Sequence, residues 1–139
     1  MTSDRLENLV RIGQLKHEPP RADELAGLKR SGLSRQEDAR RADLAFESRF
    51  DLAYNAAHAL SLFALRRSGY RAENRYLVFQ TLPETAGLAT GQWRVLAKAH
   101  EKRNLAEYEG YLEQDEQLLA DMLVATQALV ETLENTGWA

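Results

Sequence analysis

Polar side chains recur at helical spacing along two stretches that otherwise have the composition of buried helix. In the second half of the chain these residues are His100, Asn104, Tyr108 and Tyr111. At about 100° per residue, all four project to one side of a helix. Imidazole, amide and phenol groups on one face are able to bind polar ligands and to transfer protons. This stripe is therefore the first candidate for a functional site.

A second polar stripe lies near the middle of the chain. Its members are Asp51, Tyr54, Asn55 and His58, which are spaced i, i+3, i+4 and i+7 and share one arc of a helix. A buried polar group without a partner costs roughly 1–3 kcal/mol. Two such stripes in one protein therefore indicate either a hydrogen-bonded network that fixes helix register or an open cleft for a ligand.

Other kinds of chemistry find little support in the sequence. His58 and His100 fall on different predicted helices, and neither has a second histidine three or four residues away, so we predict no metal site. No glycine-framed serine suggests a nucleophile, and no glycine-rich loop suggests a phosphate cradle. We accordingly expect neither a metal nor an organic cofactor.

The segment from His100 to Tyr108, HEKRNLAEY, resembles the signature of the HEPN superfamily. The segment Phe50–Leu60, with the Gly-Tyr-Arg that follows at 69–71, is similar to that family's long second helix and the turn after it. The resemblance covers roughly residues 44–134. It implies an up-and-down helical bundle, commonly a dimer. Many members are metal-independent ribonucleases, some of them toxins paired with nucleotidyltransferase-type antitoxins, and others only bind.

The resemblance also implies roles for single residues. Arg103 and Asn104 match the arginine and the polar residue of the family's catalytic motif, whereas Tyr108 stands where the commonest form has histidine. A phenol, with an ordinary pKa of about 10, is a poor base near neutral pH, and an imidazole is a competent one. His100, one turn before Asn104, is the candidate to supply that base. A second pairing, Arg94 with His100, lacks the polar residue after the arginine.

In a site of this kind the arginine holds the scissile phosphate, the asparagine orients it, and the base removes the ribose 2′-proton. The catalytic candidates are then Arg103, Asn104, Tyr108 and His100, and the substrate-binding candidates are Asp51, Tyr54, Asn55 and His58. The expected ligand is RNA or a nucleotide, with weak or degenerate ribonuclease activity. The alternative is a non-catalytic helical module that dimerises or binds a nucleotidyltransferase-like protein.

Helices joined by short turns must position these residues. The first helix ends before Pro19-Pro20, and a second runs from about Arg21 to Arg30, with Gly32 just past its end. The spacing of Ser34 and Glu37 matches a capping box, which starts a helix that reaches about residue 68 and breaks near 42–44. The apolar stretch 44–65 is expected to be the most enclosed element.

Three further helices are expected downstream, over Arg71–Gln80, Trp93–Glu109 and Leu112–Glu134. Gly110 marks the end of the second of them. The third carries one apolar stripe, made of Leu118, Met122, Ala125, Leu129 and Leu133. No segment alternates with period two for long enough to predict a strand. The chain is therefore expected to be a single all-α domain over 1–139, with an N-terminal helical extension (1–40) and a core bundle (44–134).

Composition limits the function further. The 139 residues include no cysteine, and the net charge of −3 argues against a broad nucleic-acid-binding face. A basic run does occur at Arg66, Arg67, Arg71 and Arg75, which indicates either a solvated helix end or an anion-binding patch.

The longest apolar stretch, Ala56–Leu65, is too short to span a membrane, and the first residues do not resemble a secretory signal. We expect a cytoplasmic protein. We also expect a homodimer that joins two copies of the Arg103 region, because the apolar central helix and the aromatic residues Trp93 and Tyr111 offer more apolar surface than one small bundle can bury.

Overall fold

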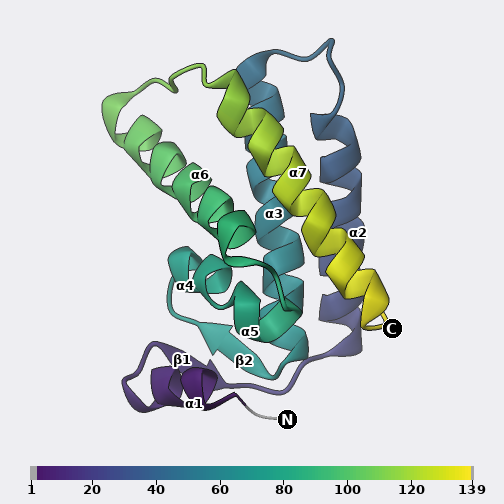
Figure 1. Ribbon diagram of the computed structural model, residues 1–139, viewed down its shortest axis with the longest axis vertical. Coiled ribbons are helices and arrows are strands. Elements are labelled where there is room, and N and C mark those ends of the chain that lie inside the picture. Colours follow the sequence, from purple (N-terminus) through teal and green to yellow (C-terminus); the bar gives the residue numbers. More distant parts are fainter. Residues whose placement is uncertain (1–2, 139) are drawn as a thin grey trace.

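The computed structural model describes residues 3–138, and it is mostly helical (Figure 1). The elements in chain order are α1 (Asp4–Arg11), β1 (Leu15–His17), α2 (Ala22–Ala39), α3 (Phe46–Arg67), β2 (Tyr70–Ala72), α4 (Arg75–Gln80), α5 (Leu82–Ala86), α6 (Thr90–Glu109) and α7 (Glu116–Asn135). The predicted all-α class is confirmed. Positions 1, 2 and 139 of the predicted domain lie outside the described residues. None of the described helices has the length and apolar character needed to cross a membrane.

Helix α3 runs through the centre of the molecule, with α2 and α7 along one side and α6 on the other (Figure 1). Twelve of its 22 residues are buried, so the prediction that this segment is the most enclosed helix is confirmed. The predicted apolar stripe of α7 is confirmed as well. Its five members are all buried: Leu118, Met122, Ala125, Leu129 and Leu133.

Helix α2 differs from the prediction, because one continuous helix replaces a stop at Gly32 and a new start at Ser34. Gly32 is buried inside α2, where its missing side chain lets the helix approach Leu60 of α3. Helix α2 ends at Ala39, and the next helix, α3, begins at Phe46. Leu25 and Leu28 of α2 pack on the main core, so the segment before residue 40 shares that core with the helices that follow.

The prediction that the chain contains no strand is wrong. Strand β1 pairs with β2 in antiparallel fashion, with Leu15 opposite Ala72 and His17 opposite Tyr70. Each strand has only three residues, which is too few to show an alternating pattern in the sequence. Gly69, with φ of +92°, makes the turn between α3 and β2 that brings the strand back to β1.

Two members of the basic run, Arg66 and Arg71, are ion-paired and are therefore neither a solvated helix end nor an open anion site. The Arg66 side chain is 1% exposed, and its Nε and Nη2 atoms each lie 3.1 Å from a carboxylate oxygen, of Glu24 and Glu18 respectively. It also donates hydrogen bonds to the carbonyl oxygens of Glu18, Pro19 and Tyr70. Arg71 pairs with the same two carboxylates. These two arginines therefore fasten the segment before α2 to the end of α3.

Candidate functional site

Helices α3, α4 and α6 bring the two predicted polar stripes together. The phenol oxygen of Tyr54 lies 2.9 Å from Nδ1 of His100, and the amide nitrogen of Asn104 lies 3.2 Å from Nε2 of the same ring. Because that amide nitrogen donates to Nε2, the imidazole proton belongs on Nδ1 and points to Tyr54. The surrounding side chains form what we call the polar cluster, made of Tyr54, His58, Arg75, His100, Arg103 and Asn104.

Two guanidinium groups flank the Tyr54 ring. The central carbon of Arg103 lies 4.8 Å from the ring centre and that of Arg75 lies 5.9 Å from it, within the range of cation–π contacts. Nη1 of Arg75 also reaches the Tyr54 hydroxyl at 3.5 Å. Tyr54 itself is 1% exposed, so a buried phenol is the common contact of both arginines and His100.

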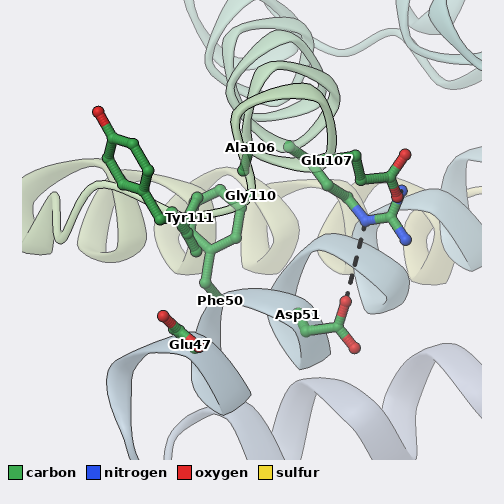
Figure 2. A pocket seen from close by; sticks show the side chains of 9 residues that line it. Glu47, Phe50, Asp51, Ala106, Glu107, Gly110 and Tyr111 are labelled. Atoms are coloured by element: carbon green, nitrogen blue, oxygen red, sulfur yellow. Dashed lines mark ion pairs between the residues drawn. The ribbon is translucent and has the colours of Figure 1, made fainter.

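Arg103 is also held by acidic residues. Its Nε lies 3.8 Å from a carboxylate oxygen of Asp51, the contact marked in Figure 2, and its Nη1 lies 3.0 Å from a carboxylate oxygen of Glu107. Arg75, in contrast, has no ion pair with any of residues 3–138. The cluster therefore contains one arginine that is neutralised and one that is available to an anion.

Both histidines of the cluster are held in the neutral form. Burial, together with repulsion from Arg75, Arg103 and the protonated form of His100, lowers the pKa of His58 to about 4. Burial, with the positive charges of Arg75 and Arg103, also lowers the pKa of His100. Their rings stack on Tyr54, with centroids 6.5 Å away for His58 and 6.1 Å for His100. Both imidazoles therefore remain neutral at pH 7.

A groove of about 350 Å³ opens beside the cluster, between the start of α3 and the end of α6 (Figure 2). Phe50 and Tyr111 supply aromatic walls, and Arg103 lies at its inner side. Three carboxylates line it together with that single arginine: Glu47, Asp51 and Glu107. The groove is therefore more acidic than the polar cluster next to it.

The structure separates some of the predicted site residues from the others. Tyr108 is 93% exposed and points away from His100, although both were predicted to lie on one face. Gly110, with φ of +87°, ends α6 before Tyr111, which is 66% exposed on the rim of the groove. Asn55 donates to the carbonyl oxygen of Asp51 at 2.9 Å and makes no hydrogen bond to the cluster.

The rotation of α6 explains this separation. Leu96 and Ala99 face the core, so the side chains that follow them at 100 and 103 enter the cluster and position 108 turns outward. Arg75 is the member that sequence reasoning missed as a site residue, because it was grouped with the basic run before it. Asn74, whose side chain caps the first turn of α4, is the signal that Arg75 starts a separate element.

Among residues 3–138, no group of three or more histidine, aspartate or glutamate side chains is arranged to hold a metal ion. No protein-family model, curated protein or solved structure matches this chain.

Proposed function

We propose that the chain is a HEPN-like protein that binds RNA by its phosphate backbone at the polar cluster and cleaves it slowly without a metal ion. The observation that carries this proposal is a neutral histidine, His100, which is hydrogen-bonded to Tyr54, the residue whose ring also contacts Arg75 and Arg103. Arginine is suited to phosphate because its planar donors match two phosphate oxygens at once. A neutral imidazole next to such a pair is suited to proton abstraction.

In this proposal Arg75 makes the first contact with a phosphate, because it has no carboxylate partner among the described residues. Nε2 of His100 accepts the proton of the ribose 2′-hydroxyl once the amide of Asn104 moves from it to the substrate. The 2′-oxygen attacks phosphorus and the bond to the 5′-oxygen breaks, giving a 2′,3′-cyclic phosphate. The 5′-oxygen leaves with a proton returned from the imidazolium. Arg103 stabilises the charge that develops on the phosphate.

A second candidate function is a non-catalytic interaction module, which includes the nucleotidyltransferase-like partner implied by the family resemblance. The contact of Arg103 with Asp51 and Glu107 favours it, because an incoming phosphate must displace these carboxylates. The acidic groove beside them favours it for the same reason. This competition is also why we expect the ribonuclease activity to be low.

The test measures binding and cleavage of the same labelled single-stranded RNA in EDTA, by fluorescence anisotropy and by gel. We expect Arg75→Ala and Arg103→Ala each to weaken binding about tenfold, the effect of one charge-assisted contact. We expect His100→Ala to retain binding and to lose cleavage about 100-fold or more. Arg94→Ala is the matched control, because Arg94 is an exposed arginine of the same helix outside the cluster.

Tyr108→His gives a second control. Its side chain points into solvent, so a histidine there cannot reach the phosphate held by Arg75, and we expect the cleavage rate to stay the same. Equal binding by wild type, Arg75→Ala and Arg103→Ala would reject the polar cluster as an RNA-binding site. The interaction module would then be the better account of the cluster.

A further inference from the structure

Three aromatic rings surround His100. Their centroids lie 6.1 Å (Tyr54), 6.0 Å (Phe79) and 6.5 Å (Tyr76) from that of the imidazole. Tyr54 is 1% exposed and Phe79 is 0% exposed, so neither offers a face to a ligand. Tyr76 is 36% exposed. Among the aromatic rings that contact His100 within residues 3–138, Tyr76 is therefore the one that reaches solvent.

Helix α4 fixes Tyr76 in this position. The helix lies against α6 (Figure 1), and the side chain of Asn74 caps its first turn by accepting a 3.0 Å hydrogen bond from the backbone N–H of Leu77. Residues 77–79 are buried, whereas Arg75 and Tyr76 are exposed. The start of α4 therefore presents a guanidinium group and an aromatic ring at the surface of the polar cluster.

We infer that Tyr76 stacks on an unpaired nucleobase, so that the polar cluster selects single-stranded RNA. This role rests on the proposed function, in which Arg75 holds the phosphate and Nε2 of His100 accepts the proton of the ribose 2′-hydroxyl. The base on that ribose must then lie beside His100. The rings of Tyr54 and Phe79 are covered by protein there, which leaves Tyr76 as the ring that meets the base.

A base can meet this ring only when it is unpaired. In a double helix both faces of a base are covered by the neighbouring base pairs, so a paired base must first leave the stack. An aromatic side chain stacks on any base, because every base has a π face, and modest preferences follow the strength of stacking. Purines have the larger ring. We therefore expect tighter binding of adenylate chains than of uridylate chains.

Two substitutions separate the effect of the ring from that of its surroundings. Tyr76→Leu removes the ring and keeps an apolar side chain, and Tyr76→Phe keeps the ring and removes the hydroxyl. Tyr108→Leu is the matched control, because Tyr108 is an exposed tyrosine of α6 outside the polar cluster. Thermal unfolding followed by circular dichroism should give similar midpoints for all three variants, since neither tyrosine is buried.

The binding test compares two labelled chains that lack the 2′-hydroxyl and so cannot be cleaved. One is a short deoxyadenylate oligonucleotide, and the other has the same sugar–phosphate backbone without bases. By fluorescence anisotropy, we expect Tyr76→Leu to bind the first chain about tenfold more weakly than wild type, a typical effect of one stacked base, and to bind the second equally well. Tyr76→Phe and Tyr108→Leu should bind both chains as wild type does.

Salt dependence separates stacking from phosphate binding. Arg75→Ala removes one phosphate contact, so the slope of log K against log salt concentration should become shallower by about 0.7. Tyr76→Leu removes no charge, so its slope should equal that of wild type. Adding the complementary strand to the deoxyadenylate chain should weaken binding to wild type, because its bases are then paired.

A fluorescent base reports the contact in wild type itself. 2-Aminopurine loses fluorescence when it stacks, so we place it as the single base on an otherwise abasic chain. At saturating protein its fluorescence should fall with wild type and with Tyr76→Phe, and it should stay unchanged with Tyr76→Leu.

Three results would overturn the stacking role. If wild type and Tyr76→Leu bind the two chains with the same affinities while Arg75→Ala binds both weakly, the phosphate contact stands and Tyr76 has no part in it. If Tyr76→Leu weakens both chains equally, the side chain only supports α4. If Arg75→Ala binds both chains as wild type does, the proposed function itself fails and the role of Tyr76 fails with it.

Discussion

His58 lies at the inner end of the polar cluster, stacked on Tyr54 and edge-on to Phe79 at a centroid distance of 6.0 Å. Its pKa of about 4 is far below the ordinary value near 6.5, chiefly because the ring is buried. The unfolded chain therefore binds a proton at His58 in a pH range where the folded chain does not. Stability must rise with pH across that range.

The first prediction is that wild type loses about 2 kcal/mol of unfolding free energy between about pH 7 and pH 5 through His58 alone. The contribution of neutral His58 to the unfolding free energy is complete above about pH 6.5 and is lost as pH falls toward 4. His58→Phe keeps an aromatic ring and removes the titration, so its stability should change less over the same interval. Urea unfolding followed by circular dichroism at both pH values checks this. Equal losses in the two proteins would contradict it.

The carboxylates with lowered pKa values do not change the stability in the pH interval where His58 titrates. Hydrogen bonds from His17 and Tyr70 lower the pKa of Glu7, and a hydrogen bond from Arg71 lowers that of Glu18. A carboxyl group whose pKa is lowered by folding contributes its full share of the unfolding free energy at any pH above its pKa in the unfolded chain. That share is lost only at lower pH. The loss between pH 6.5 and 4.5 therefore reports on the histidines.

At the scale of elements, the approach of α2 to α3 depends on one glycine. A methyl group at Gly32 would lie 2.5 Å from Cγ of Leu60, closer than packed carbons allow. The same group at Gly27, five residues earlier in α2, would find no heavy atom nearer than 3.9 Å. The two positions share a helix and differ in what they face.

The second prediction follows from this pair. Gly32→Ala should destabilise the protein by about 1–3 kcal/mol, because α2 and α3 must move apart. Gly27→Ala should be neutral or stabilising by up to about 1 kcal/mol, because alanine is the better helix former. Denaturation midpoints of both variants check the contrast. A similar midpoint for both would mean that Leu60 adjusts without cost.

The same glycine shows what sequence patterns can predict. Helices α6 and α7 were recognisable because Gly110 and the apolar stripe of α7 give unambiguous signals. Gly32 was predicted to follow the end of a helix. The sequence alone does not distinguish a glycine that ends a helix from one that lets two helices pack closely. Helical spacing placed His100 and Tyr54 each on a polar stripe of its own helix, but it did not show that the two stripes face each other. The outward turn of Tyr108 was not predictable either, because spacing leaves the rotation of a helix about its axis open.

At the scale of the whole molecule, Arg66 joins three parts of the chain. Pro19 has no backbone N–H to donate to a neighbouring strand. The guanidinium group of Arg66 instead donates hydrogen bonds to the carbonyl oxygens of Glu18 and Pro19. A lysine at this position could not meet the same fixed set of acceptors.

The third prediction is that Arg66→Met destabilises the protein by about 3–5 kcal/mol, because the carbonyl oxygens of Glu18, Pro19 and Tyr70 lose their buried donor, although Arg71 still pairs with both carboxylates. Arg67→Met is the control, since that neighbour is partly exposed and makes a 3.0 Å hydrogen bond to Thr136, worth about 1 kcal/mol. Urea unfolding gives the free energies. Trypsin adds a local measure, because the loosened segment should expose Lys16 to faster cleavage. Equal effects of the two substitutions would contradict the anchoring role.

This anchor also sets an order of events during synthesis of the chain. Leu15 leaves the ribosome long before Ala72, its partner in the sheet, and before the guanidinium of Arg66 that holds the intervening segment. At about 5–20 residues per second, the first strand waits several seconds for its partner. Closing so long a loop is slow compared with forming the local contacts of α2 and α3. Strand β1 should therefore become protected from proteases and chaperones later than α2 and α3, although it is synthesised before them.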